Sequence, residues 1–333
     1  MKNKVLIIAE AGVNHNGNVD IAIELCKKAK SSGADVIKFQ TWKTEKIISR
    51  TVDQAEYQQE NTGNKISQFD MLKQLELSYS DFKNIKKYCD SIDIAFCSTA
   101  DEEESLDFLL ELGIPFIKIG SGEINNIPFL RYIGSKKIPV LLSTGMSYLS
   151  DVDIAYRTLQ NAGSSDISIL HCTTNYPCSY NDVNLNALKT LKSSFNCPIG
   201  YSDHTIGHEI SIAAVALGAS IIEKHFTLDI NMKGPDHAAS TMPNQFKDMV
   251  NAIRNVENAL GTGNKYPSEA EKKISNVVFK RIVAKRDIAF NECFSEENIC
   301  VKRNNVGMFA SMWDFVIGKP AKKNYSENEA IDI

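Results

Sequence analysis

Short apolar runs that end in polar residues recur along the first two thirds of the chain. Each run is nearly continuous in hydrophobic residues, and segments with helical spacing separate the runs. Strands of this kind are typical of a parallel sheet that helices cover on both faces. The eight runs lie at residues 5–12, 35–41, 94–99, 116–122, 139–145, 167–174, 199–204 and 221–227.

Eight alternating strand and helix units over roughly 250 residues predict a (β/α)8 TIM barrel of class α/β. An open doubly wound sheet would show a similar alternation, but no G-x-G-x-x-G motif follows the first run. The helical pattern over 242–260 is the last one before a polar segment, so we place the barrel domain at residues 1–262.

The stretch 199–237 carries the clearest chemical signal. Its two apolar runs, IGYSDH and IIEKHFT, flank a helical pattern, which predicts two neighbouring parallel strands. His204 and His225 then lie at matching strand ends about 5 Å apart, where two imidazoles can bind one divalent metal ion. The predicted buried face of the intervening helix consists of Ile210, Ala213, Ala214 and Leu217.

Ionisable and polar residues stand at the end of nearly every run. In a barrel, the carboxyl ends of the strands meet at the one face where active sites are built. All six histidines follow this rule, and we expect them on that face. They are His15, His171, His204, His208, His225 and His237.

Lys38 and Lys118 stand in the second and fourth runs, and two lysines at one barrel mouth are a costly arrangement unless an anion lies between them. With the hydroxyl groups of Thr99, Ser121, Ser143 and Ser202 and the KIGSG turn, they indicate a phosphate cradle. The alternative is that the lysines reach solvent or pair with Glu10 or Glu123. The acids available for proton transfer or for binding sugar hydroxyls are Glu10, Glu123, Asp203, Glu223 and Asp236.

The segment between the second and third runs is too long for a simple connection. Residues 65–77 and 78–91 have helical patterns, and Ser80 is the predicted N-cap of the second helix. The polar residues 49–65 predict a long loop over the barrel mouth, with a functional role or as a solvated excursion.

The C-terminal part has a different composition. Residues 263–276 have the polar, Gly- and Pro-containing composition of a linker, and short strands and turns are expected at 277–288, 293–303 and 315–323. A domain of residues 277–333 is marginal for an independent core, so we expect it to lean on the barrel or on another subunit.

Composition narrows the possible partners and the compartment. A net charge of −4 argues against nucleic acid or an acidic membrane as the main partner. Eight cysteines without a C-x-x-C pair predict reduced thiols. The N-terminal run VLIIA is shorter than the apolar core of a secretory signal, and no stretch approaches a membrane-spanning length, so we expect a cytoplasmic protein.

Nine motifs together resemble the sialic acid synthase family, which includes legionaminic and pseudaminic acid synthases. They are IAEAGVNHNG, VIKFQT, FCSTA, KIGSGEINNIPFL, LLSTGM, LHCTTNYP, YSDHTIG, EKHFTLD and GPDHAAS, and AEYQ and NTG in the long loop agree with them. The resemblance implies condensation of phosphoenolpyruvate with an N-acetylated mannosamine to a nine-carbon 2-keto acid sugar, with C–O cleavage of the phosphate. It also implies an antifreeze-like (SAF) domain at the C-terminus and a domain-swapped homodimer.

The resemblance also implies roles for individual residues. His204 and His225 would bind Mn²⁺ or Mg²⁺, and Glu10 would act on water near the reacting carbons. Arg303 would reach the sugar site of the partner subunit. Phosphoenolpyruvate would be held by Lys38, Thr99, Lys118, Ser121, Ser143 and Ser202, and the amino sugar would face Gln40, Glu123, Tyr176 and Asp236.

Two positions depart from the family pattern. Thr174 stands where many members have Asn, and is a shorter donor for phosphate. Asn304 stands where the usual KRPGNG motif has a proline, so Arg303 lacks a stiff neighbour.

Several functions stay open at this point. The acceptor sugar could be N-acetylmannosamine, a 2,4-diacetamido-trideoxy mannose of the legionaminic acid branch or its altrose isomer of the pseudaminic acid branch. A metal-dependent aldolase or another phosphoenolpyruvate synthase would share the fold, and a carbohydrate-binding protein on an inactive barrel is the non-enzymatic alternative.

Overall fold

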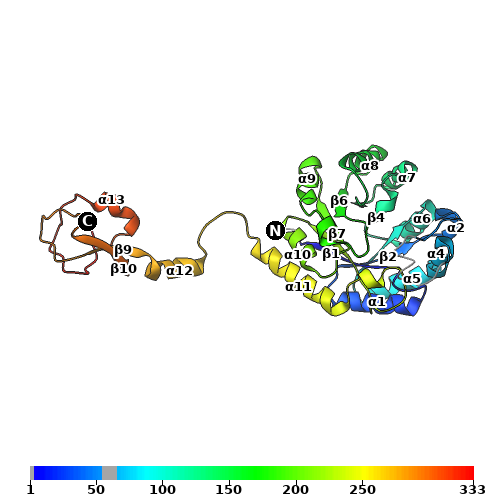
Figure 1. The fold of residues 1–333 in the computed structure, drawn as a ribbon, viewed down its shortest axis with the longest axis horizontal. Coiled ribbons are helices and arrows are strands. Elements are labelled where there is room, and N and C mark those ends of the chain that lie inside the picture. Colours follow the sequence, from blue (N-terminus) through cyan, green and yellow to red (C-terminus); the bar gives the residue numbers. More distant parts are fainter. Residues whose placement is uncertain (1–3, 55–65) are drawn as a thin grey trace. The chain divides into compact units, whose positions relative to one another are not determined.

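The computed structural model describes residues 4–54 and 66–333, and its first part is a closed barrel of eight parallel strands in sequential order (Figure 1). The predicted (β/α)8 barrel is therefore confirmed. The loop motifs AEYQ and NTG lie outside the described residues. The strands are β1 (Leu6–Gly12), β2 (Val36–Thr41), β3 (Ala95–Ala100), β4 (Ile117–Ile119), β5 (Val140–Ser143), β6 (Ile167–Cys172), β7 (Ile199–Asp203) and β8 (Ile221–His225).

Helices form the outer ring of the barrel (Figure 1). No helix in the described ranges 4–54 and 66–333 is long and apolar enough to cross a membrane. The helices of this part are α1 (Val19–Ser31), α2 (Thr44–Ile47), α4 (Gln68–Leu75), α5 (Tyr79–Ser91), α6 (Glu103–Leu112), α7 (Ile127–Ser135), α8 (Leu149–Ala162), α9 (Ala187–Ser194), α10 (Glu209–Ala216) and α11 (Pro243–Ala259).

Two local predictions about helices were wrong. The N-cap of helix α5 is Ser78 and not Ser80, because Ser78 and Asp81 cap each other's backbone N–H groups in a capping box. The fully buried residues of α10 are Ser211, Ala214 and Val215, whereas Ile210 and Leu217 of the predicted face are partly buried against the core. Ser211 is turned inward because its hydroxyl donates to the carboxylate of Asp203 at 2.6 Å.

Inside the barrel, the lower part is filled by an apolar layer. Seven side chains form it, six from strands and Phe116 from the residue just before β4, and alternate positions beyond them lead to the polar strand ends. The remaining strand, β7, contributes Gly200, where an added Cβ would lie 2.4 Å from a side-chain carbon of Leu170 and 2.7 Å from one of Ile221. The layer consists of Ile8, Val36, Cys97, Phe116, Leu141, Leu170 and Ile221.

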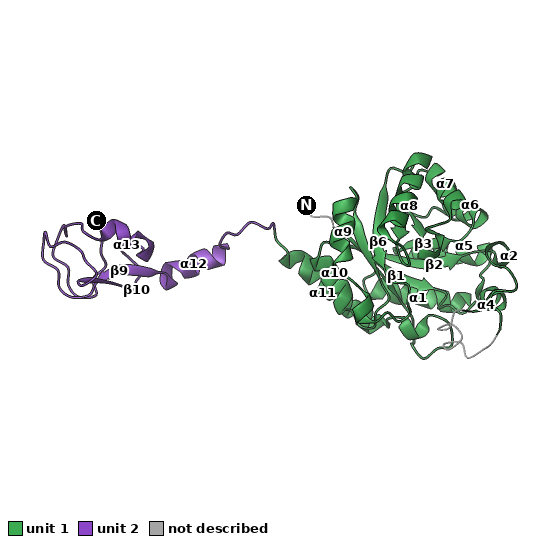
Figure 2. Cartoon of the chain, turned by 45° about the horizontal axis from the view of Figure 1, so that its top comes forward, with its two compact units in different colours: residues 1–261 green, residues 262–333 purple. Residues whose placement is uncertain are grey.

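Residues 262–333 form a second compact unit (Figure 2). Its helix α12 (Glu269–Val278) occupies much of the predicted linker, and a capping box between Ser268 and Glu271 starts it. Strands β9 (Lys280–Ala284) and β10 (Ile299–Arg303) pair in antiparallel fashion, and α13 (Trp313–Val316) overlaps the third predicted run. The unit has its own core, which includes Ile282, Ile288, Phe294, Ile299, Val316, Tyr325 and Ile331.

Candidate active site

A buried carboxylate, Glu223, lies between the two predicted lysines. Its oxygens lie 3.6 Å from Nζ of Lys38 and 3.6 Å from Nζ of Lys118, and Oγ of Ser202 donates to it at 2.9 Å. Burial opposes ionisation, but the two lysines outweigh it and lower the pKa of Glu223 to about 2. Glu223 is therefore a fixed negative charge that holds both cations, and not a free acid.

Lys38 has a second carboxylate partner, Glu10, at 2.6 Å. Gln40 Nε2 donates to the other oxygen of Glu10 at 3.1 Å, and Lys38 donates to Oγ1 of Thr99 at 3.0 Å. Burial raises the pKa of Glu10 to about 7 although Lys38 opposes the shift. Glu10 can therefore bind or release a proton near neutral pH, which suits a general acid or base.

Lys118 Nζ donates to Oγ of Ser143 at 2.8 Å and to the backbone carbonyl of Ile119 at 3.1 Å. Ser121 lies beside this pair, and its hydroxyl accepts a hydrogen bond from the backbone N–H of Gly145 at 3.0 Å. The lysines thus pair with Glu10 and Glu223 while hydroxyl groups surround them. They line one cavity of about 170 Å³ together with Glu10, Gln40, Thr99, Asp101, Gly120, Ser121, Ser143, Cys172, Tyr176, Ser202, His204, Glu223 and His225.

The two predicted metal ligands face each other at the same mouth. The ring centroids of His204 and His225 lie 5.4 Å apart, and the ring of Tyr176 lies 4.2 Å from that of His204. His204 Nδ1 donates to the carbonyl of Thr173 at 2.7 Å, so in the neutral ring Nε2 keeps the free lone pair. His225 Nδ1 is buried without a hydrogen-bond partner and lies 3.8 Å from Oδ2 of Asp236.

These residues fit a divalent metal ion. Burial, and then the nearby His204, lower the pKa of His225 well below its ordinary value, so that the ring is neutral as a ligand must be. Across the described residues, no group of three or more His, Cys, Asp or Glu side chains is arranged to hold a metal. An ion bound here would have two imidazole ligands, and its other positions would be open for substrate and water.

Some predicted residues lie outside this cavity. Glu123 accepts a hydrogen bond from Asn126 at 2.6 Å in the turn after β4. Asp236 lies beside His225, and burial raises its pKa to about 6. Arg303 is exposed at the end of β10 in the C-terminal unit.

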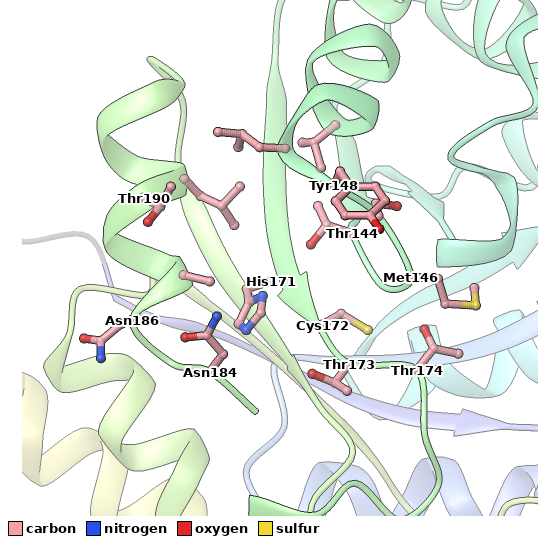
Figure 3. Close-up of a pocket in the computed structure, with 15 residues that line it drawn as sticks. Thr144, Met146, Tyr148, His171, Cys172, Thr173, Thr174, Asn184, Asn186 and Thr190 are labelled. Carbon is pink, nitrogen blue, oxygen red and sulfur yellow. The ribbon is translucent and has the colours of Figure 1, made fainter. Parts of the chain in front are cut away.

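Thr174 lines a different cavity of about 700 Å³, between α8 and α9 on the outer side of β6 (Figure 3). Its labelled lining residues carry no acidic or basic group except His171, which hydrogen-bonds the carbonyl of Val183 at 2.7 Å. Burial lowers the pKa of His171. Cys172 lines both this cavity and the charged one.

All six histidines lie at or near the strand ends, as expected, but they do not meet in one cavity. His171 faces the larger cavity, and His208 is partly exposed at the start of α10. His15 and His237 are buried in the loops after β1 and β8, where His237 Nδ1 shares a hydrogen bond with Thr227 Oγ1 at 2.6 Å. Only His204 and His225 line the charged cavity.

Asp203 is not available for proton transfer or sugar binding. Side chains alternate along β7, so Ser202 faces the barrel interior and Asp203 faces the helices. There Asp203 forms a buried ion pair of 2.9 Å with Lys224.

Sequence reasoning missed two residues that line the charged cavity, Asp101 and Cys172. Burial, and then the nearby Glu123, raise the pKa of Asp101 to about 7. Asp101 is two residues after Thr99 and four after Cys97, and Cys172 is two residues after Leu170 of the apolar layer. Because every second residue of a strand faces the same side, the sequence could have predicted both residues in the barrel interior.

A closed parallel barrel with paired acids, lysines and histidines at the carboxyl ends of its strands is the architecture of a barrel enzyme. The NeuB family matches residues 25–265 of this chain. N,N'-diacetyllegionaminic acid synthase of Campylobacter jejuni is 47% identical over 98% of this chain and 99% of its own length. The enzyme of the same name from Legionella pneumophila is 44% identical over 96% of this chain and 91% of its own.

Solved structures agree with these sequence matches. The N-acetylneuraminic acid synthetase of Leptospira borgpetersenii superposes with a TM-score of 0.73 at 33% identity, over 83% of this chain and 93% of that one. This chain belongs to the NeuB family and is an enzyme, and the resemblance inferred from its motifs is confirmed.

Proposed function

We propose that this enzyme condenses phosphoenolpyruvate with a 2,4-diacetamido-trideoxy mannose to form N,N'-diacetyllegionaminic acid and phosphate. The two relatives with 47% and 44% identity carry the name of that synthase and match nearly the whole chain. They favour this acceptor over N-acetylmannosamine, the acceptor of the first hypothesis from the sequence.

The buried lysine pair is the observation that carries the proposed use of phosphoenolpyruvate. Two ammonium groups, each within 3.6 Å of one carboxylate, lie under a cavity lined by hydroxyl groups. With Glu10 protonated, the charges of Lys38, Lys118 and Glu223 add up to one net positive charge without a metal ion. A phosphate and a carboxylate on one small molecule would complement that charge and the hydroxyl donors of Thr99, Ser121, Ser143 and Ser202.

Glu10 is the residue that we assign to proton transfer. As C3 of phosphoenolpyruvate forms a bond with the aldehyde carbon of the open-chain sugar, the aldehyde oxygen becomes a hydroxyl and takes a proton from Glu10. The resulting carboxylate then takes a proton from the water that adds at C2. The bond between C2 and the bridging oxygen then breaks, the C2 hydroxyl gives its proton to the departing phosphate and C2 becomes the carbonyl. One water is consumed, and Glu10 is returned to its starting state.

The remaining residues would orient the two substrates. His204 and His225 would hold Mn²⁺ or Mg²⁺, which supplies polarisation of the aldehyde when bound. Gln40, which is bonded to Glu10, and Tyr176, which lies against His204, would contact the sugar. Glu123, Asp236 and Thr174 would have supporting roles in sugar or phosphate binding. The eight cysteines are free thiols, which agrees with a cytoplasmic reaction.

We also propose that the C-terminal unit is an antifreeze-like domain that acts on a partner subunit. In the proposed homodimer, Arg303 would reach the partner's sugar site and bind with a fork of N–H donors that Lys lacks. Mixing Arg303→Ala with His225→Ala protomers tests this directly. About half of the dimers would then be mixed with one intact site each, giving about a quarter of wild-type activity. Activity that equals only the average of the two parents would contradict action in trans.

The test of the proposed function is a substrate panel. Purified enzyme with Mn²⁺ and phosphoenolpyruvate is given each acceptor in turn: the diacetamido-trideoxy mannose, its altrose isomer and N-acetylmannosamine. Phosphate release and product mass are followed. We expect the highest kcat/KM with the diacetamido-trideoxy mannose, and a higher value with N-acetylmannosamine would restore the first hypothesis.

A further inference from the structure

The residue that directly precedes each of the two site histidines belongs to one buried ion pair. Asp203 precedes His204, Lys224 precedes His225, and Asp203 and Lys224 are register partners on β7 and β8. Because side chains alternate along a strand, His225 and Glu223 face the interior while Lys224 faces the helical layer. The pair therefore stands behind the histidines, on the other side of the barrel wall.

The ion pair is fully buried and nearly saturated with hydrogen bonds. The side chains of Asp203 and Lys224 are 0% and 1% exposed, and Nζ lies 2.9 Å from Oδ2. Lys224 also donates to the carbonyl of Thr205 at 2.8 Å. Asp203 Oδ1 accepts from the N–H and the hydroxyl of Thr205 at 2.9 and 2.7 Å, and Oδ2 accepts from Ser211 at 2.6 Å.

These bonds join four pieces of the chain. The carboxylate belongs to the end of β7, the ammonium group to β8, Thr205 to the loop that leaves β7, and Ser211 to α10. His204 lies between Asp203 and Thr205, so the backbone on both sides of this histidine is tied to the same carboxylate. A shift of β8 along β7 would break the bond between Asp203 and Lys224 and move His225 relative to His204.

Stability alone does not account for this pair. A buried ion pair is often no more stabilising than apolar side chains of similar volume. Among the described residues, the other lysine–carboxylate pairs buried on both sides lie inside the barrel, at Lys38 and Lys118. The pair on the outer face occurs at the one strand junction that carries both histidines.

We propose that Asp203 and Lys224 are positioning residues that fix the spacing and ring orientation of His204 and His225 for divalent metal binding. This inference rests on the metal-dependent function proposed above. The residues contact neither substrate nor metal and act through the backbone of β7 and β8. Their loss would leave both imidazoles present but misaligned, and loss of outer-shell support typically weakens metal binding 10- to 100-fold.

The test measures metal binding and histidine geometry separately. Lys224→Met removes the cation while keeping most of the side-chain volume, and Asp203→Asn keeps the shape and an oxygen acceptor. Mn²⁺ affinity is measured by titration calorimetry. The ring nitrogen resonances of ¹⁵N-histidine-labelled, metal-free protein report the two rings without any metal. We expect Kd to rise 10- to 100-fold and the resonances of His204 and His225 to move.

A matched control separates positioning from general destabilisation. Arg254 pairs with Asp35 at 2.8 Å just before β2, at the opposite end of the barrel. Arg254→Met should lower the melting temperature while leaving the Kd for Mn²⁺ and the two histidine resonances unchanged. Lys224→Arg, which restores the charge, should recover part of the affinity lost in Lys224→Met.

The results of these measurements distinguish failure of the positioning role from failure of the metal-dependent function. A folded Lys224→Met protein with a Kd within about twofold of wild type and unmoved histidine resonances overturns the positioning role. If Lys224→Met does not fold, the same criteria apply to Asp203→Asn. A wild-type protein that binds no Mn²⁺ or Mg²⁺ would instead overturn the metal-dependent function, which distinguishes the two failures.

Discussion

The barrel interior contains two regions with opposite chemistry on the same strands. The apolar layer carries side chains such as Ile8, Val36 and Leu170, and two residues further along are Glu10, Lys38 and Cys172. Two residues of strand span only about 7 Å. The apolar layer closes the bottom of the cavity to water, and the charged groups above it therefore interact in a weakly polar environment. This is why the pKa of Glu10 rises to about 7 while that of Glu223 falls to about 2.

The largest effect should come from the histidine pair in the charged region. His225→Ala should lower kcat/KM on the order of 1,000-fold or more, with little change in melting temperature, because a metal ligand at an open mouth is lost. Steady-state kinetics and thermal unfolding measure both effects. Chelation should silence the wild type and Mn²⁺ should restore it.

His208→Ala is the matched control for that experiment, because His208 lies at the same end of the barrel but outside the charged cavity. Its activity should stay near that of the wild type. Full activity after exhaustive chelation would contradict the proposed metal dependence.

The apolar layer should respond in the opposite way. Leu170→Ala removes a fully buried side chain that packs between strands and should lower the free energy of unfolding by about 2–5 kcal/mol. Activity per folded molecule at 25 °C should change little, since Leu170 does not line the charged cavity. Urea unfolding and active-site titration check the two effects. A large loss of kcat at unchanged stability would show that the two regions are not separable.

A smaller effect is expected within the phosphate cradle. Lys118→Ala removes a charge-assisted contact of about 1.5–3 kcal/mol and should raise the KM for phosphoenolpyruvate roughly 10- to 150-fold. The KM for the sugar should change much less. Lys136→Ala, which removes a partly exposed lysine paired with Asp107, is the control. Equal increases in both KM values would place Lys118 in general structural support.

The smallest effect concerns His15, a buried histidine outside the charged cavity. Burial lowers the pKa of His15 to about 4, below its ordinary value of 6.5, so the unfolded chain binds a proton at a higher pH than the folded one. Stability from this residue is complete above about pH 6.5 and is lost as the pH falls toward 4. The loss between pH 7 and 5 should be about 1–2 kcal/mol.

His15→Gln should flatten this decline even if it lowers stability at pH 7. Urea unfolding of the wild type and the variant at both pH values measures the difference. An unchanged slope would show that His15 is not the titrating group.

Much of the fold and part of the candidate site follow from local patterns in the chain. The eight apolar runs predict the eight strands because a strand buried on both faces has to be apolar along its whole length. Polar residues at the run ends predict the position of Lys38, Lys118, His204 and His225, because parallel strands in a barrel end at one face. Alternation along β3 would also have included Asp101, two residues after Thr99.

Other features depend on contacts between distant segments. The sequence places Glu223 and Asp203 in one list of acids, but Glu223 binds two lysines inside the barrel and Asp203 binds Lys224 outside it. The buried face of α10 differs from the predicted one because Ser211 bonds to Asp203, a contact that hydrophobic spacing does not encode.

The sequence by itself determined the eight-stranded barrel, the family and the residue types at the strand ends, since each depends on period, spacing and motif order. Tertiary structure alone decided which histidines face each other, which acids are neutralised and which carboxyl group can hold a proton near pH 7. The physical reason is that ionisation and orientation depend on burial and on the charges within a few ångströms. Those neighbours, such as Glu10 and Lys38 or Lys118 and Glu223, are tens to hundreds of residues apart in the chain and meet only when the barrel closes.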